Sequence, residues 1–152
     1  MIKLLPYHHS KSRYKRKGGK NKIRIKDQVN ISQRPKDVQL RQEVGHWEGD
    51  LMIGLGQKSA IGTIVERKAR YTFIIKLENR KSQTVTQQFA KYVTTLPKYT
   101  LKSMTCDNGM DTRAKLELAK QMANHKWFSN NTGMEIFFAT PFSSNEKGTN
   151  EI

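Results

Sequence analysis

The chain has 152 residues, enough for one domain and a short extension. Its 28 Lys and Arg against 13 Asp and Glu give a formal net charge of +15, which indicates a polyanionic partner such as DNA, RNA or acidic lipid. A single cysteine, Cys106, excludes an internal disulfide, and no apolar run approaches the ~18–20 residues that span a bilayer. The composition predicts a soluble, intracellular protein of a reducing cytoplasm, with no membrane segment.

Most of the charge lies in the N-terminal part of the chain. Residues 1–44 hold 13 basic and three acidic residues, so +10 of the net +15 falls in less than a third of the chain. Residues 11–26 have no apolar period and contain two adjacent glycines, which is typical of a disordered segment. Such an arm can be a solvated tail, or it can be a strip that contacts phosphates and releases counterions. The two interpretations are compatible. The predicted DNA contacts of this arm are Lys11, Arg13, Lys15, Arg16, Lys17, Lys20, Lys22, Arg24 and Lys26.

Residues 45–152 are predicted to form the folded domain, and it begins with three strands. In residues 47–54 side chains alternate, with Glu48 and Asp50 on the face opposite the apolar one. Residues 59–66 and 70–77 are rich in β-branched and aromatic side chains, and the connections are short. The three segments predict an antiparallel meander. The apolar positions of the first strand are Trp47, Leu51 and Ile53.

The pattern then changes to a helical period. Apolar residues in 82–96 recur at helical spacing and Pro97 follows, so an amphipathic helix is expected there. Residues 100–106 predict a fourth strand, and because a helix precedes it, this strand is expected to lie parallel to the first.

The remaining residues predict one more helix and one more strand. A helix is expected from Asp111 or Thr112 to about Lys126, followed by a loop over 127–133. Residues 134–138 predict a fifth short strand, before a polar loop. The order β-β-β-α-β-α-β predicts an α/β fold with a mixed sheet and helices on its faces.

Three acidic motifs are distributed over this predicted fold. GHWEGD ends at Asp50, TCDNG is centred on Asp107, and GTNE ends at Glu151. A right-handed crossover can place the fourth strand beside the first, which would bring Asp50 and Asp107 together. Carboxylates that converge in this way are suited to Mg²⁺ or Mn²⁺, and two such ions can flank one scissile phosphate. The sequence therefore predicts metal-dependent phosphodiester chemistry on nucleic acid.

Each carboxylate also has a simpler interpretation. Asp107 in DNG is the residue type that most often forms a turn, and Glu151 is the second residue from the C-terminus. Asp50 is harder to explain without a function, because strands are depleted in Asp and no neighbour in the sequence neutralises it.

The same motifs carry a family resemblance. Residues 31–54, followed by KSAIGTIVERKARYTFIIKL, resemble the core of bacterial insertion-sequence transposases marked by a GHWEGD box, and the resemblance extends to Glu151. It implies an RNase H-like integrase catalytic core with two Mg²⁺ (or Mn²⁺) ions held by Asp50, Asp107 and Glu151. It also implies that DNA, as transposon ends and target, is the partner, that Lys147 contacts DNA, that the protein is nucleoid-associated, and that a homo-oligomer is possible.

The chain departs from the family pattern in several places. Asp107 and Glu151 are 44 positions apart, roughly ten more than the family spacing, and Asn145-Glu146 replaces an aromatic-Gln pair. The helix that follows the glutamate in the family, and the N-terminal helix-turn-helix region, have no counterpart in the sequence. The resemblance therefore implies a truncated core whose final helix is missing and whose transposase activity is weak or lost, because a loosely held catalytic group loses rate steeply.

Two other functions fit the same sequence. A non-catalytic DNA-binding remnant would act through its basic arm alone. A hydrolytic nuclease of the same fold, acting on RNA–DNA hybrids, would use the same carboxylates, and only the GHWEGD resemblance disfavours it.

Overall fold

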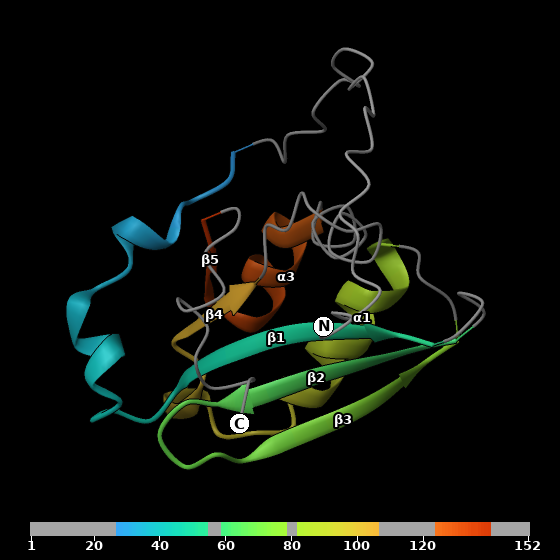
Figure 1. The fold of residues 1–152 in the computed structure, drawn as a ribbon, viewed down its shortest axis with the longest axis horizontal. Coiled ribbons are helices and arrows are strands. Elements are labelled where there is room, and N and C mark those ends of the chain that lie inside the picture. The colour runs from blue at the N-terminus through green and yellow to red at the C-terminus, as the bar shows by residue number, and fades with distance from the viewer. Residues whose placement is uncertain (1–26, 55–58, 79–81, 107–123, 141–152) are drawn as a thin grey trace, which may run out of the picture.

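The computed structural model describes residues 27–54, 59–78, 82–106 and 124–140. Within these ranges the chain forms a five-stranded mixed sheet with strand order β3-β2-β1-β4-β5 and two helices packed on one of its faces (Figure 1). The predicted α/β fold with a mixed sheet is confirmed. No helix in the described ranges is both long and apolar enough to cross a bilayer.

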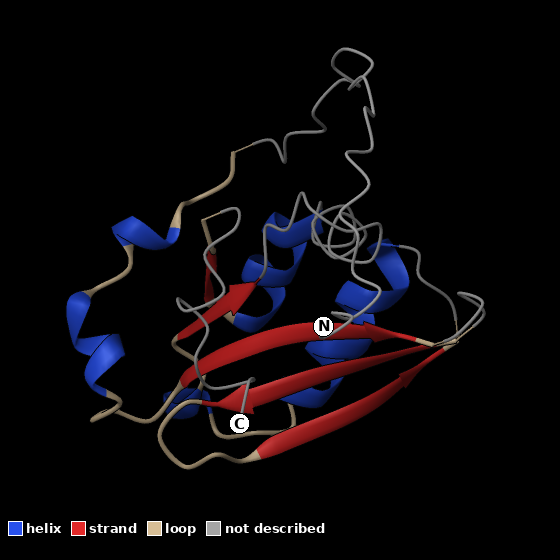
Figure 2. Cartoon of the chain, in the orientation of Figure 1, coloured by secondary structure: helices blue, strands red, loops and turns tan. Residues whose placement is uncertain are grey.

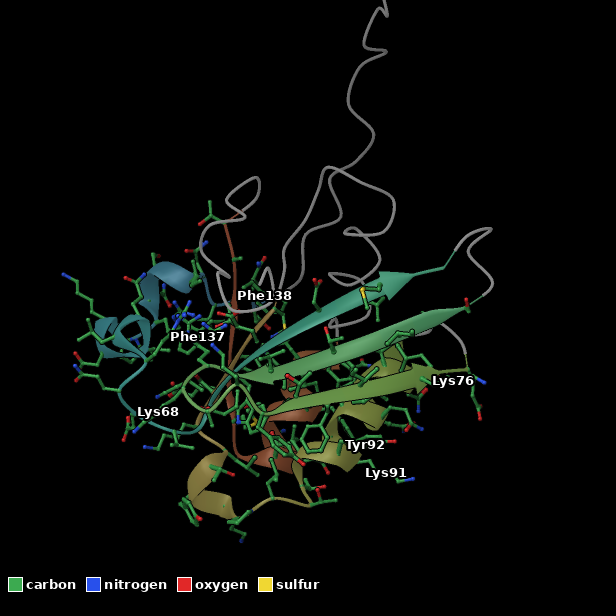
Figure 3. The ribbon with its side chains drawn as sticks, turned by 60° about the horizontal axis from the view of Figure 1, so that its bottom comes forward. Lys68, Lys76, Lys91, Tyr92, Phe137 and Phe138 are labelled. Carbon is green, nitrogen blue, oxygen red and sulfur yellow. The ribbon has the colours of Figure 1, made fainter. Side chains whose placement is uncertain are left out.

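Strands β1 (His46–Ile53), β2 (Ala60–Glu66) and β3 (Thr72–Leu77) form the predicted antiparallel meander (Figure 2). Glu66 closes the turn that joins β2 to β3, because its Oε2 accepts a hydrogen bond from the Lys68 backbone N–H at 2.9 Å. Figure 3 shows Lys68 at this turn and Lys76 toward the other end of β3. The meander forms one half of the sheet, with β1 at its inner edge.

The other half of the sheet is parallel. β4 (Ser103–Cys106) lies beside β1, and β5 (Glu135–Phe138) lies beside β4, both in parallel register. The crossover from β3 to β4 contains helix α1 (Ser82–Val93) and the short 3-10 helix η4 (Lys98–Thr100). The fourth strand is therefore parallel to the first, as its position after a helix predicts. β1 is hydrogen-bonded on both sides and is the central strand of the sheet.

Helix α1 packs on the face of the sheet that carries the odd-numbered residues of β1. Phe89 lies at its centre, fully buried, next to Gly49 and Gly62 of neighbouring strands. A Cβ at Gly62 would lie 2.8 Å from the Phe89 Cζ, so glycine is needed for this close approach. An aromatic cluster extends the contact, with ring centroids 6.0 Å apart for Trp47 and Phe73. Tyr92, labelled in Figure 3, adds an edge contact to Phe73 at 5.6 Å.

Residues His125–Thr132 form helix α3, so the sequence-based prediction of a loop over 127–133 is wrong. Phe128 and Thr132 point inward one helical turn apart, and Gly133 ends the helix in the left-handed conformation with φ of 74°. The run of Ser and Asn in this segment suggested a loop, but those side chains lie on the outer face of a short amphipathic helix. The predicted helix from Asp111 or Thr112 falls largely in 107–123, outside the described residues.

Residues 27–44, which the sequence assigned to the basic arm, pack against the sheet. They contain two 3-10 helices, η1 (Ile31–Gln33) and η2 (Lys36–Leu40), and Asn30 forms a parallel bridge with Phe138 of β5. Ile31, Arg34 and Val38 are buried. This segment is therefore ordered, because it covers part of the sheet face opposite α1. Residues 1–26 of the predicted arm lie outside the described residues, and the domain boundary at residue 44 stays a prediction.

Candidate active site

Asp50 lies on the central strand, on the face of the sheet that points away from α1. Its position follows from the strand alternation, because Gly49 faces Phe89 of α1 and the next residue faces the other way. The side chain is half-buried and its Oδ1 accepts a hydrogen bond from the Leu51 backbone N–H at 2.9 Å. Across the meander Asp50 pairs with Thr63 of β2. At this position β1 is paired with β2, and its pairing with β4 ends at the preceding residue, Gly49.

The parallel register brings the end of β4 to the same level. Cys106, the last residue of β4, pairs with Gly49, the residue before Asp50. Asp107 follows directly in the sequence but lies outside the described residues, as do Glu151, Lys147 and the basic residues from Lys11 to Lys26. Of the predicted catalytic residues, Asp50 alone falls in the described ranges. Within those ranges no group of three His, Cys, Asp or Glu side chains is close enough to hold a metal ion.

Glu48, two residues before Asp50 on the same face of β1, has a different environment. It is 0% exposed and forms an ion pair with Arg67, which is itself buried. Burial is the main cause that lowers the Arg67 pKa to about 10, and the nearby Arg34 guanidinium lowers it further. Arg67 therefore stays charged at neutral pH. Its Nε also donates a hydrogen bond to the Val38 carbonyl at 3.3 Å, which ties η2 to the sheet.

A second polar contact fixes η1 and the residue that follows it. The buried Arg34 Nη1 donates a hydrogen bond to the Thr105 Oγ1 of β4 at 2.9 Å. Because Thr105 pairs with Glu48 across β1 and β4, Arg34 and Arg67 approach the same part of the sheet face. Two arginines thus anchor residues 34–38 on β1 and β4.

His46 begins β1 and is buried between two polar side chains. Its Nδ1 and the Ser103 Oγ are hydrogen-bonded at 2.8 Å, and its Nε2 lies 3.5 Å from the Glu43 carboxylate. Burial lowers the pKa of His46, although Glu43 acts in the opposite direction. The pKa of Glu43 is lowered by its hydrogen bonds to Lys102 and His46. These contacts hold the start of β1 against the start of β4.

The roles of Glu48, Arg67 and Arg34 were not apparent from the sequence. Strand periodicity placed Glu48 on the face opposite the apolar one, but it did not show that residues 34–38 cover that face. A usable signal was present in the sequence, because Glu48 lies within the acidic motif and Arg67 follows directly after β2. An acidic residue in a strand usually requires a cationic partner when it is buried.

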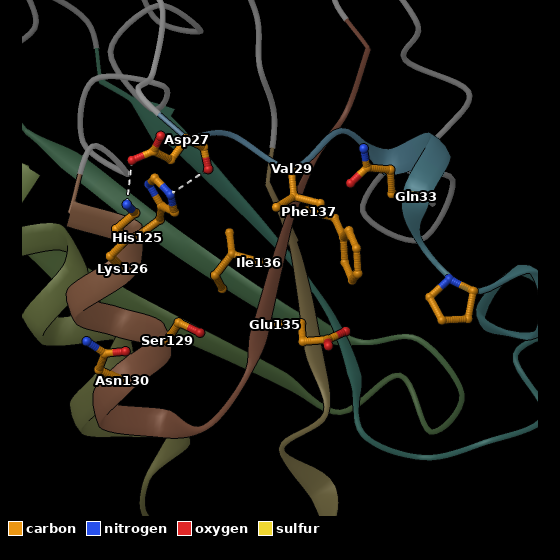
Figure 4. Close-up of a pocket in the computed structure, with 11 residues that line it drawn as sticks. Asp27, Val29, Gln33, His125, Lys126, Ser129, Asn130, Glu135, Ile136 and Phe137 are labelled. Carbon is orange, nitrogen blue, oxygen red and sulfur yellow. Dashed lines mark hydrogen bonds and ion pairs between the residues drawn. The ribbon is translucent and has the colours of Figure 1, made fainter.

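The structure also contains a groove of about 600 Å³ between β5, α3 and the segment before η2. Figure 4 shows Asp27 at one end, where its carboxylate pairs with Lys126 and its carbonyl oxygen lies 3.3 Å from the His125 Nε2. Ile136 and Phe137 of β5 are among the residues that line it. Asp50, the one predicted site residue within the described ranges, does not line this groove.

Comparison with known proteins gives sequence relatives over most of the chain. No family model matches. The chain is 37% identical over 139 residues to "Transposase InsI for insertion sequence element IS30A" of Escherichia coli (strain K12), which covers 91% of this chain and 33% of that protein. It is 32% identical over 135 residues to the transposase for insertion sequence element IS1086 of Cupriavidus metallidurans, with 89% and 37% covered. The chain thus spans about a third of the length of the curated relatives it matches.

Among solved structures, the chain is similar to the catalytic core domain of BIV integrase. The TM-score is 0.52 at 15% sequence identity, over 70% of this chain and 62% of that chain. This likeness shows the fold, which is the RNase H-like fold of an integrase catalytic core. The expectation of such a fold is confirmed.

Proposed function

Because the chain is homologous to bacterial insertion-sequence transposases and has the fold of an integrase catalytic core, we propose that it carries the catalytic core of such a transposase. The reaction would be cleavage and transfer of a DNA strand at the ends of an insertion sequence. Asp50, Asp107 and Glu151 would be the catalytic carboxylates. The single observation that best supports this assignment is the register of β1 and β4, in which Cys106 pairs with Gly49.

This register bears on a metal site because β1 contains an acidic residue and β4 is followed by one, and the two positions are at nearly the same level of the sheet. Asp50 follows Gly49 in β1, and Asp107 follows Cys106 in the sequence. Carboxylate oxygens are the ligands that Mg²⁺ and Mn²⁺ prefer, so the donor types fit such an ion. A pair of divalent ions supplies activation of the attacking oxygen and charge neutralisation on the leaving oxygen.

The residues of the chain would contribute positioning and charge. Asp50 is fixed in direction by the Leu51 N–H and by its place on the central strand. The basic residues from Lys11 to Lys26, with Lys147, would contact the phosphates of the DNA, because +10 of the net +15 lies in residues 1–44. Nucleoid association and assembly as a homo-oligomer stay predictions.

A metal-binding experiment tests the site independently of turnover. The full chain is titrated with Mn²⁺, and the bound ion is followed by electron paramagnetic resonance. We expect Asp50→Asn and Asp107→Asn each to weaken Mn²⁺ binding by about tenfold or more, since even the supporting partners of metal ligands contribute this much. Asp37→Asn is the matched control, because Asp37 is an exposed carboxylate on η2. Equal Mn²⁺ affinity in all four proteins would contradict the assignment.

The same proteins separate catalysis from binding. With a duplex that carries an insertion-sequence end, any Mn²⁺-dependent nicking should disappear in Asp50→Asn, while DNA affinity stays nearly unchanged. If DNA binding persists and no variant of the carboxylates affects Mn²⁺ or nicking, the alternative function of a non-catalytic DNA-binding remnant is favoured. The concentration of positive charge in residues 1–44 is the observation that supports this second candidate.

A further inference from the structure

A polar pocket of about 280 Å³ lies between α1 and α3. Three of its side chains come from α1 at positions i, i+3 and i+4, so they lie on one face of that helix. The other two come from the N-cap residue of α3 and from its first turn. The lining side chains are Gln83, Thr86, Gln87, Asn124 and Trp127. The described lining contains no charged group. Its polar atoms are amides and one hydroxyl beside the indole ring of Trp127.

Trp127 is not part of the hydrophobic core. Its side chain is 42% exposed, whereas the adjacent Phe128 is fully buried and provides the core contact of α3. An aromatic ring of this size that stays half-exposed beside hydrogen-bonding amides is the arrangement that binds planar heterocycles by stacking and edge contacts. The pocket volume lies just below the range of about 300–1,000 Å³ for drug-sized ligands, so it suits a single ring system.

The pocket lies at the end of the sheet where β1 and β4 have their C-termini, and this end is called the C-terminal edge below. β3 runs parallel to β1 through their common neighbour β2, and α1 begins shortly after β3 ends, so the N-terminus of α1 is at the C-terminal edge. α3 leads through Gly133 into β5, which is parallel to β4, so the N-terminus of α3 is at the same edge. The ring of His125 at that terminus lies 5.5 Å from the ring of Phe138 at the end of β5.

Figure 1 shows α1 and α3 on the same face of the sheet. Asp50 faces the opposite side of the sheet near the C-terminal edge. A DNA strand that passes around the edge would meet both features.

We propose that this pocket binds one base of an unpaired DNA strand, with Trp127 stacked on the base and the amides of Gln83, Gln87 and Asn124 bonded to its edge. The inference rests on the proposed function in one respect, namely that DNA is the partner. The described lining offers amides, a hydroxyl and an indole ring. A base offers both a π face and hydrogen-bonding edges, which match the indole and the amides.

Tryptophan fluorescence of the full chain tests the proposal. The chain has two tryptophans, and Trp47 is 2% exposed, so a change on DNA addition should come from Trp127. We expect a single-stranded oligothymidylate to quench the emission saturably, and a blunt duplex of the same length to leave it nearly unchanged. An oligomer of abasic residues, which keeps the phosphates and lacks the bases, should bind through phosphates without quenching. Equal quenching by the abasic oligomer would overturn the proposal.

Substitutions test the same pocket by affinity, measured as fluorescence anisotropy of a labelled oligothymidylate. Trp127→Ala should weaken binding about tenfold, as expected for the loss of one stacked base. Trp127→Phe should restore most of that affinity, because it keeps an aromatic face, and its remaining emission from Trp47 should not be quenched. Gln87→Ala should weaken binding, whereas Gln42→Ala, at an exposed glutamine outside the pocket, should not.

The slope of the logarithm of the DNA affinity against the logarithm of the salt concentration distinguishes the contribution of the pocket from that of the basic arm. Trp127→Ala should leave this slope unchanged, because stacking releases no counterions. Unchanged affinity in Trp127→Ala would refute the base site. Asp50→Asn should keep both the quenching and the affinity, so a failure of the proposed metal site and a failure of the base site give different results.

Discussion

Glu48 and Asp50 point to the same face of β1, two residues apart, and they have different surroundings. Glu48 is completely buried against Arg67, beneath residues 34–38, while Asp50 lies beyond that cover and is half-buried. A carboxylate that is already paired in the interior is poorly suited to bind a solvent-derived metal ion, because the ion would have to displace its partner. Of the two acidic residues of the GHWEGD motif, Glu48 is thus part of a buried ion pair of the fold, and Asp50 is the one that we propose for catalysis.

Removing the charge of Glu48 should destabilise the fold strongly. In Glu48→Gln the guanidinium of Arg67 stays buried without its carboxylate, and breaking a buried pair in this way costs about 3–5 kcal/mol. The free energy of unfolding, measured by urea titration with tryptophan fluorescence, should fall by that amount. Asp37→Asn is the control, because Asp37 is an exposed carboxylate on η2 and its charge should contribute little. If Glu48→Gln is as stable as the unaltered chain, the buried ion pair does not hold residues 34–38.

At the scale of single elements, the contact between α1 and the sheet depends on the absence of a side chain. Phe89 enters the space above β1 and β2 that Gly49 and Gly62 leave open. The strand alternation and the helical period were sufficient to predict both elements, and the parallel order of β4 followed from the helix before it. The size of the gap that receives Phe89 was not predictable, because it depends on which residues of two strands lie opposite the same helical turn.

Gly62→Ala should therefore destabilise the protein although alanine has the higher strand propensity. The added methyl would meet the Phe89 ring, and overpacking of this kind costs about 1–3 kcal/mol. The midpoint of thermal unfolding should fall. Gly133→Asn serves as the control, because a Cβ at Gly133 meets nothing within 4 Å and Asn tolerates the left-handed conformation of that residue. A larger loss in Gly133→Asn than in Gly62→Ala would contradict this packing argument.

α3 shows where local sequence is a weak guide to an element. Its composition of Ser, Asn and Thr has low helix propensity, and the prediction of a loop over 127–133 followed from it. The helix forms because Phe128 is buried against the sheet and Gly133 supplies the turn into β5. Tertiary packing outweighs local propensity here, and the pocket between α1 and α3 exists only as a result of that packing.

At the scale of the whole molecule, the basic N-terminal region contains two parts with different physical character. Residues 27–44 are packed on the sheet by apolar side chains and two buried arginines, and they hold three basic and three acidic residues, so the whole +10 of residues 1–44 lies in residues 1–26. Charge content alone placed the boundary at residue 44. The ordered part was missed because the charge was summed over residues 1–44, which concealed the change at residue 27, and because the partners of the buried Ile31 and Val38 lie far away in the sequence. For the candidate site, the motif predicted a role for Asp50, which stays a prediction, but it did not indicate that residues 34–38 cover Glu48.

Two truncated chains test where the folded unit begins. A chain of residues 27–152 should unfold cooperatively with nearly the same free energy of unfolding as the full chain, because it keeps η1, η2 and both arginine contacts. A chain of residues 45–152 should lose about 3 kcal/mol or more, since Ile31 and Val38 are buried and each such side chain contributes about 1.5–3 kcal/mol. It would also leave Glu48 and Arg67 without their cover, which raises the cost further.

The removal of residues 1–26 should affect DNA binding, although it should hardly affect stability. Residues 1–26 hold most of the basic residues of the arm, so the 27–152 chain should show weaker binding and a flatter dependence of affinity on salt while its stability is retained. If the 45–152 chain is as stable as the full chain, residues 27–44 are not part of the folded unit, and their contacts with β1 and β4 do not contribute to it. If the 27–152 chain keeps the full salt dependence, the phosphate contacts come from the packed domain instead of the arm.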